Sequence, residues 1–576
     1  MTATPHEPPR RSAFPGSLFV PKLVTVLRKG YSFASFRADF FAGLTVAIVA
    51  LPLAMALAIA SGTTPDKGLL TAAVAGFLIS ALGGSRFQIG GPTGAFVVVV
   101  FNVIDQQGFD GLVIATFMAG IILIVAGFAR LGTWIKYIPE PVVTGFTAGI
   151  AVIILSSQFK DFFGLSLDQV PAAFFDKWPA FWAVRDTLSP ATLGVAVGAL
   201  VLIVVLRRFA PRLPGFLIAV ALASVVVLVF GLPVETIGSR FGGVSSSIPM
   251  PSLPEVTLAR LGELLPSAFT IAFLAGVESL LSAVVADGMT GRRHRSNCEL
   301  VAQGVANAAS ALVGGIPATG AIARTATNVR TGARSPVAGM IHAVIVLLFM
   351  LFLAPVADVI PLASLAAVLV VVAVNMSEMG RFRALLRGPW GDRLVLLLTF
   401  GLTVAVDLVL AIEVGVVLAA VLFMHRMTGV VAISSGQAVG LIEEDVDDFS
   451  TPPGEAVRKP LVLPRHVETF HVRGPLFFGV AGHFAEVIDR ISGTPRVLIL
   501  RMREVPMIDS TGASRLKDLL VRCRRQGTVV LVTGLQAQPR RVLGEMGILA
   551  EDDEHLRVLP DIEAAVVVAR SIVGEG

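Results

Sequence analysis

From about residue 38 to about residue 430, the chain is a succession of apolar segments with few charged residues between them. A helix needs about 20 apolar residues to cross a bilayer, and within lipid a helix satisfies its own backbone hydrogen bonds. The sequence therefore predicts an α-helical polytopic membrane domain. The charged residues, which make up only 15% of the chain, become dense from about residue 440, so we expect a soluble domain to follow.

The membrane domain contains about 14 apolar segments. They lie near residues 40–60, 69–82, 93–103, 112–129, 141–158, 191–206, 215–230, 265–286, 299–313, 320–329, 336–353, 359–374, 394–409 and 411–425. The segments near 93–103 and 320–329 are about half as long as a full span.

The loop charges predict which side of the membrane each loop faces. With the N-terminus inside, 16 Lys and Arg residues fall in inner loops and six in outer loops. This bias indicates that both termini are cytoplasmic. The membrane itself is expected to be a bacterial-type inner membrane. Residues 1–37 are expected to be a cytoplasmic tail, because the start is proline-rich and basic without an apolar core. The six outer residues are Lys67, Lys160, Lys177, Arg185, Arg240 and Arg260.

Two interruptions of the apolar pattern repeat each other. "GGPTGAF" at Gly90–Phe96 resembles "GGIPATGAIA" at Gly314–Ala323, and their leading glycines are 224 residues apart. The same offset places the first predicted span on the eighth. The chain is therefore expected to contain two inverted seven-span repeats, residues 38–230 and 261–430, as secondary transporters with a site at the membrane midplane do.

Non-helical backbone inside a membrane is tolerated around a cavity or within protein. Each interruption precedes an apolar half-helix, and a helix start presents unpaired N–H groups and a positive dipole end. Two such starts meeting at mid-membrane predict an anion site, to which Thr93 and Thr319 can add hydroxyl donors. The alternative is that the glycines and prolines only let helices pack closely.

Charged residues within spans suggest function, because burying them in lipid is costly. Glu278 lies centrally in the eighth predicted span, with Ser282 one turn further on, and Arg324 lies in the second half-helix. We expect Glu278 to form an ion pair with Arg324 beside the bound anion. The alternative is that this ion pair only holds two helices together. Glu278 could instead take up a proton with the anion, or bind sodium. Asp287 and Glu299, at span ends beside a basic loop, are expected to form solvated pairs.

With these residues in view, the chain resembles the sulfate permease (SulP) family of anion transporters over nearly its whole length. Four stretches carry the resemblance: "GGSRFQIGGPTGAF", "KYIPEPVVTGFTAGIAV", "ESLLSAVVADGMTG" and "GGIPATGAIARTATNVRTGARSP". The resemblance implies a homodimer of 14-span subunits with core and gate domains, and an anion site between the third and tenth half-helices. The residues implied for that site are Pro52, Leu53, Gly91, Thr93, Gly94, Ala95, Glu278, Ser282, Ala321, Ile322 and Arg324.

Two departures from the family pattern bear on the substrate. Sulfate-type members have P-Q-x-x-A-Y-A in the first span, whereas "PLAMALA" here places Leu53 and Leu57 at the Gln and Tyr positions. This is more similar to the bicarbonate and dicarboxylate branch. Sodium-coupled members have Asp and Thr where this chain has Glu278 and Ile322, so the resemblance favours proton coupling.

The soluble part is expected to be a small α/β domain at residues 463–576, after a linker at 440–462. "RVLILRM" and "TVVLVTG" are typical of buried strands, and "TGASRLKDLLVRCRRQG" of an amphipathic helix. "MIDSTGASRL" resembles the phosphorylation loop of anti-sigma-factor antagonists, hence a STAS domain, with Ser510 as the regulatory position. The alternative, which we favour, is that Asp509, Ser510 and Thr511 only cap the following helix.

The leading hypothesis is a proton-coupled secondary transporter of small oxyanions. Bicarbonate or a four-carbon dicarboxylate is the favoured substrate, and sulfate is the next candidate. The alternatives are a sulfate/proton symporter, an uncoupled anion channel, a nucleobase permease of similar fold, and a membrane sensor that signals through its tail. No nucleotide-binding loop is evident, so we expect no enzymatic activity. The 8 histidines and two cysteines do not cluster, and no basic stripe is present. We therefore expect no metal, no cofactor and no nucleic-acid partner.

Overall fold

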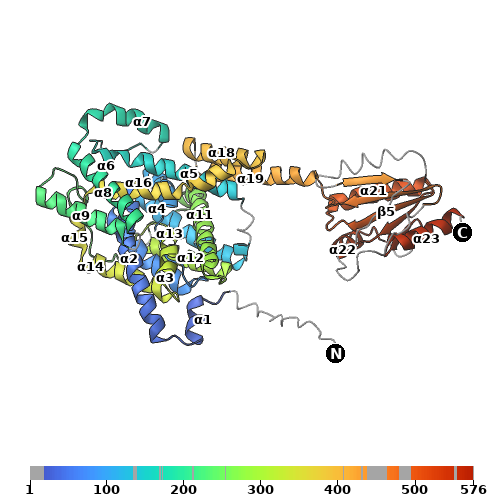
Figure 1. Ribbon diagram of the computed structural model, residues 1–576, viewed down its shortest axis with the longest axis horizontal. Helices are drawn as coiled ribbons and strands as arrows, with labels where there is room; N and C mark the ends of the chain where they lie inside the picture. Colours follow the sequence, from blue (N-terminus) through green and yellow to red (C-terminus); the bar gives the residue numbers. More distant parts are fainter. Residues whose placement is uncertain are drawn as a thin grey trace. The chain divides into compact units, whose positions relative to one another are not determined.

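The computed structural model describes residues 19–133, 139–167, 170–171, 173–210, 213–252, 254–406, 408–429, 432–436, 463–478, 495–549 and 554–574. The chain forms two compact units, residues 1–419 and 420–576 (Figure 1). The predicted linker at 440–462 and the first 18 residues of the predicted N-terminal tail lie outside the described residues.

The first unit is built mainly from helices, the last of which continues into the second unit, and each predicted apolar segment falls on a helix. In chain order the elements are α1 (Lys22–Arg28), α2 (Phe33–Ala60), α3 (Pro65–Leu82), β1 (Gly90–Gly91), η2 (Gly94–Phe96), α4 (Val97–Phe128), η3 (Leu131–Thr133), α5 (Glu140–Ser157), α6 (Phe159–Phe163), α7 (Phe174–Ala183), η5 (Arg185–Thr187), α8 (Pro190–Phe209), α9 (Gly215–Phe230), α10 (Ile237–Phe241), α11 (Leu258–Thr290), α12 (Ser296–Leu312), β2 (Thr319–Gly320), α13 (Ile322–Arg330), α14 (Val337–Phe352), α15 (Ala354–Asp358), α16 (Leu362–Met376), α17 (Met379–Leu385), α18 (Trp390–Ala405) and α19 (Leu408–Thr428).

Within the part of the chain that the structure describes, eight helices are long and apolar enough to cross a membrane, and α9 and α14 are shorter apolar helices. Helix α4 covers two predicted segments, 93–103 and 112–129. Between them its backbone leaves the helical conformation at Gly108, where φ is 71°. Glycine adopts positive φ readily, so the chain can reverse there. The count of 14 spans stays a prediction.

The longest helix, α11, shows how local sequence sets the element ends. The Thr257 side chain accepts a hydrogen bond from Arg260 N at its start, and Gly291 ends it with φ 67°. A hydroxyl N-cap and a left-handed glycine are the usual helix boundaries. The intervening apolar run carries Glu278 into the interior of the unit.

The two sequence halves are interleaved rather than separate. Helix α4 of the first half packs against α11 and α12 of the second, and α14 packs against α2 and α3. At the α4–α12 crossing, a Cβ on Gly120 would lie 2.7 Å from Gly304 O, and one on Gly304 would lie 2.5 Å from Gly120 O. Small residues let helix backbones approach this closely in membranes.

The second unit has the expected α/β fold, although its first strand precedes the predicted bounds of 463–576. Its sheet has the order β3 (Ala432–Gly436), β4 (Val467–Arg473), β5 (Val497–Glu504), β6 (Val529–Thr533) and β7 (Leu556–Leu559), antiparallel between β3 and β4 and parallel elsewhere. Helices α21 (Ser510–Arg525) and α22 (Ala537–Glu545) bury apolar residues against one face, and α23 (Ile562–Val573) against the other. The two predicted strands and the amphipathic helix are confirmed as β5, β6 and α21.

Candidate functional site

The two glycine-rich interruptions meet in the first unit. Strand β1 pairs antiparallel with β2, with Gly90 opposite Gly320 and Gly91 opposite Thr319. One residue further, Ala321 N donates to Ile89 O at 2.8 Å. The interruptions therefore satisfy each other's backbone, as buried polar groups away from water require.

Glycine is needed at this crossing because the surrounding atoms leave no room for a side chain. A Cβ on Gly90 would lie 2.3 Å from Ile79 Cδ1, and one on Gly320 would lie 1.7 Å from Gln88 Nε2. Gly91 also has φ +146°, a conformation that other residues rarely adopt. Gly314, aligned with Gly90 by the sequence repeat, lies at the end of α12 instead, because the second interruption is longer.

A half-helix leaves this crossing on each side. Thr93 is the N-cap of η2, which continues into α4, and Ala321 is the N-cap of α13. Neither cap is closed by a side-chain hydrogen bond. The first N–H groups of a helix have no intrahelical partner, so both starts present donors and a positive dipole end.

Glu278 bonds to the first of these starts. The Thr93 hydroxyl donates to Glu278 Oε2 at 3.0 Å. Both side chains are half-buried. The prediction that Glu278 pairs with Arg324 is wrong for this conformation, because the two side chains are bonded to different groups.

Arg324 lies against the backbone of the first interruption. Its side chain is only 2% exposed, and Nη2 donates to Pro92 O. A Cβ on Gly91 would lie 2.7 Å from Nη1, so the guanidinium occupies the space that this glycine leaves. Neither Nε nor Nη1 has a hydrogen-bond partner among the described residues. Buried cations are normally paired, so this guanidinium retains capacity to bind an anion.

The sequence did not indicate the polar network behind the crossing. Glu299 is fully buried and accepts hydrogen bonds from Gly84 N at 2.8 Å and Ser85 N at 3.1 Å. Its other oxygen accepts from Ser279 and Gln303, at 3.2 and 3.1 Å. The expectation of a solvated Glu299 is therefore wrong, whereas Asp287 bonds locally to the basic loop, through His294 at 2.7 Å. The spacing of Glu299 and Gln303, one helical turn, was the only sequence signal.

A second missed group holds the other interruption. The Asn307 side chain forms two hydrogen bonds with Ala318, accepting from its N and donating to its O, both at 2.8 Å. Thr71 Oγ1 accepts from Ile316 N at 2.8 Å. Together these side chains fix the residues that lead into β2 and α13.

The remaining predicted site residues surround the crossing. Ser282 is buried and donates to Thr325 Oγ1 at 3.0 Å. Pro52 and Leu53 are buried in α2, which contacts both α4 and α13. A Cβ on Gly94 would lie 2.9 Å from Met376 Sδ of α16, so that helix covers the start of η2.

Exposure differs between the two helix starts. Ala95, at the first start, is fully buried, whereas Ile322, at the second, is 38% exposed. The second start is thus the more accessible of the two in this conformation.

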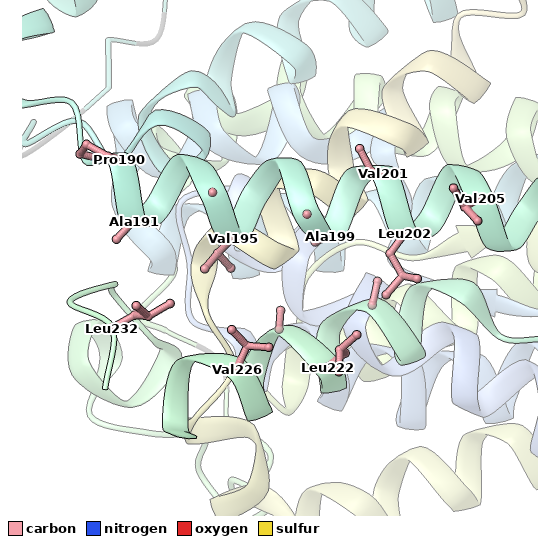
Figure 2. A pocket seen from close by; sticks show the side chains of 14 residues that line it. Pro190, Ala191, Val195, Ala199, Val201, Leu202, Val205, Leu222, Val226 and Leu232 are labelled. Atoms are coloured by element: carbon pink, nitrogen blue, oxygen red, sulfur yellow. The ribbon is translucent and has the colours of Figure 1, made fainter. Parts of the chain in front are cut away.

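Two cavities lie elsewhere in the first unit. One, of about 680 Å³, is a groove between α8 and α9 whose lining side chains are all apolar (Figure 2). It offers no side chain that could hold an anion. The other, of about 620 Å³, runs along α4 from Val97 to Asp105 and has charged walls.

In the second unit, Ser510 is exposed at the first position of α21. Asp509 is the N-cap, and its carboxylate accepts from Gly512 N at 2.8 Å and Phe478 N at 3.0 Å. The capping interpretation is confirmed for Asp509. A regulatory role for Ser510 stays a prediction.

Comparison with known proteins decides the family. Residues 36–399 match the sulfate permease family, and residues 461–564 match the STAS domain. The chain belongs to the sulfate permease family. It is accordingly a multi-pass membrane protein and an anion transporter of that family.

Relatives of this sulfate permease family member carry different substrate names. It is 41% identical to the "Putative sulfate transporter YvdB" of Bacillus subtilis, covering 90% of this chain and 95% of the relative. It is 29% identical to the "Bicarbonate transporter BicA" of Picosynechococcus, covering 92% and 93%. The fold matches the murine Slc26a9 anion transporter in the inward-facing state with a TM-score of 0.83 and 20% identity, covering 98% and 97% of the two chains.

Proposed function

We propose that this protein is a secondary active transporter of small oxyanions, coupled to protons, that binds its anion between the starts of η2 and α13. Bicarbonate or a four-carbon dicarboxylate is favoured, and sulfate is the next candidate. The proposed site consists of Pro52, Leu53, Gly91, Thr93, Gly94, Ala95, Ser282, Ala321, Ile322 and Arg324, with Glu278 as the proton-coupling residue.

The β1–β2 pairing carries this proposal. It places two helix starts side by side, and Arg324 adds a buried guanidinium with two nitrogens that lack acceptors among the described residues. Backbone N–H groups, helix dipoles and a guanidinium all favour a small oxyanion. A neutral nucleobase has no net charge for this positive field to attract, which favours an anion over a nucleobase as the substrate.

Glu278 supports coupling to protons. Its carboxylate is bonded to Thr93 at the proposed site and forms no ion pair with a described residue. A second negative charge beside a bound anion is unfavourable unless the carboxylate takes up a proton or a cation. Ile322 supplies no oxygen ligand for sodium, so a proton is the simpler partner.

The favoured substrates rest on the first span and on the relatives. Leu53 and Leu57 are buried and apolar, so α2 contributes no side-chain hydrogen bond to the anion. A monoanion such as bicarbonate has less charge to compensate than sulfate and fits such a wall better. A four-carbon dicarboxylate has the same charge as sulfate, and only the first-span pattern favours it. The names of the relatives include both bicarbonate and sulfate transporters.

Uptake into proteoliposomes tests the proposal. Labelled bicarbonate, succinate, fumarate and sulfate are compared with and without an inwardly directed proton gradient. We expect concentrative uptake of bicarbonate or a dicarboxylate only when the gradient is present. Flux that never exceeds equilibrium and ignores pH would instead identify an uncoupled channel.

We further propose a homodimer in the cell inner membrane with both termini cytoplasmic. The outer-loop charges support the orientation, since Lys160, Lys177 and Arg240, from two predicted outer loops, line one cavity. Labelling of single cysteines added at Arg185 and at Glu563, in intact cells, tests it. Only the first position should react with an impermeant reagent.

A further inference from the structure

The charged cavity lies on the face that the loop charges assign to the outside. It has a volume of about 620 Å³ and is bounded by the ends of α2 and α5, by the first part of α4 and by α7 and α10. Its charged wall residues are Asp105, Lys160, Asp161, Lys177 and Arg240.

Most of these charges are already compensated or solvated. Arg240 Nη1 lies 2.8 Å from Asp161 Oδ1, and Nη2 bonds to Glu235. Lys160 also interacts with another group. Asp105 is exposed to solvent.

Lys177 differs from the other charged wall residues. It projects from α7, is only 4% exposed, and yet makes no hydrogen bond or ion pair with any residue that the structure describes. Burial lowers the pKa of its ammonium group to about 8. Lysines are almost never this buried unless they are paired, so its position calls for a partner that enters the cavity.

The surroundings hold Lys177 in place. Its neighbour Trp178 packs edge-to-face on Phe159, with ring centroids 5.3 Å apart, and on Phe174 at 5.7 Å. This aromatic cluster fixes α7 against α6. A rigid cation on a cavity wall is preorganised to bind an anion.

The cavity also leads toward the proposed transport site. Its wall follows α4 inward from Asp105 to Val97, the residue directly after η2. An anion at Lys177 would therefore stand at the outer end of a route toward Gly94.

We propose that Lys177 forms an outer binding site for small oxyanions, where the anion is held before it reaches the site between η2 and α13. This inference rests on the proposed transport function and adds a second site to it. The Lys177 ammonium provides a charge-assisted hydrogen bond to the oxyanion, whereas Arg240 is already compensated by Asp161 and Glu235.

Kinetics of anion entry from the outer face test this site in the full-length protein. Labelled bicarbonate and sulfate are the probes, and Lys177→Met is compared with Lys177→Arg. We expect Lys177→Met to raise the KM for external anion about tenfold, the value of one charge-assisted hydrogen bond, and to change kcat by less than about twofold. Lys177→Arg should keep the wild-type KM, which shows that the position tolerates substitution when the charge is retained.

The pH profile supplies an independent readout. In the wild type, the KM should rise as external pH passes about 8, because Lys177 loses its proton. Lys177→Arg should remove that rise, since arginine stays charged. The other titratable wall residues, Asp105, Lys160, Asp161 and Arg240, are unchanged in this variant, so the difference belongs to position 177.

The matched control is Arg185→Met, which removes one positive charge from the same face outside the cavity. An unchanged KM in Lys177→Met, or an equal shift in Arg185→Met, would overturn the outer site. Wild-type vesicles that take up no anion faster than empty vesicles would overturn the proposed transport function instead. The two failures are thereby distinguishable.

Discussion

The Thr93 hydroxyl donates to Glu278 Oε2 across 3.0 Å, which joins the start of one half-helix to the middle of α11. Thr93 is the N-cap of η2, so the carboxylate stands next to the N–H groups that would receive the anion. Anion binding and the charge of Glu278 are therefore expected to influence each other through this one contact.

Replacing Glu278 by Gln should separate binding from coupling. The amide oxygen still accepts from Thr93, but the side chain no longer titrates. We expect anion uptake to continue down its gradient, while a gradient of one pH unit, worth about 1.4 kcal/mol or tenfold accumulation, no longer drives it. Proteoliposome uptake with and without the pH gradient measures this. Accumulation at the wild-type level would contradict the coupling role, and Glu263→Gln, an exposed change on the same helix, is the control.

The helix breaks were predictable because glycine, proline and the repeat are local signals. The backbone crossing requires glycine at Gly90, Gly91 and Gly320. The glycine pattern in the sequence therefore marks the place where β1 and β2 pair. The strands β5 and β6 were predictable for a similar reason, since they are short apolar runs bounded by turns.

Side-chain partners could not be predicted in the same way. Glu278 and Arg324 are charged residues within predicted spans, which suggested an ion pair, but in the structure they bond to Thr93 and to the Pro92 carbonyl instead. Glu299 resembled a solvated residue at a helix end. Its burial depends on Gly84 and Ser85, more than 200 residues away in sequence.

Gly91→Ala should strongly reduce transport through a clash with Arg324. The added methyl would lie 2.7 Å from Nη1, and alanine at φ +146° is strained by about 1–3 kcal/mol. We expect uptake to fall more than about tenfold, because the Arg324 guanidinium and the backbone at Gly91 must move apart. Gly198→Ala, on α8 where the methyl would meet nothing within 4 Å, should leave uptake unchanged. Equal uptake by both variants would show that the guanidinium can shift at no functional cost.

Glu299→Leu should destabilise the membrane unit. It leaves two backbone N–H groups and the Ser279 and Gln303 donors without their acceptor, and each buried unsatisfied donor costs about 1–3 kcal/mol. We expect a loss of at least about 3 kcal/mol, seen as a lower unfolding temperature in detergent. Glu299→Gln, which keeps one acceptor oxygen, should have an unfolding temperature between those of the wild type and Glu299→Leu. A Leu variant as stable as the wild type would mean that water replaces the carboxylate.

The second unit offers a test that separates capping from regulation at α21. Asp509 accepts hydrogen bonds from Gly512 N and Phe478 N, whereas the exposed Ser510 side chain bonds to no described residue. Asp509→Ala should therefore cost about 1–2 kcal/mol, and Ser510→Ala close to nothing. In the full-length protein, hydrogen exchange of residues 495–549 should speed up at least about fivefold in the first variant only. Faster exchange in Ser510→Ala would assign the serine a structural part in the cap. If exchange is unchanged but uptake shifts, Ser510 acts on transport without holding the helix, as a regulatory position would.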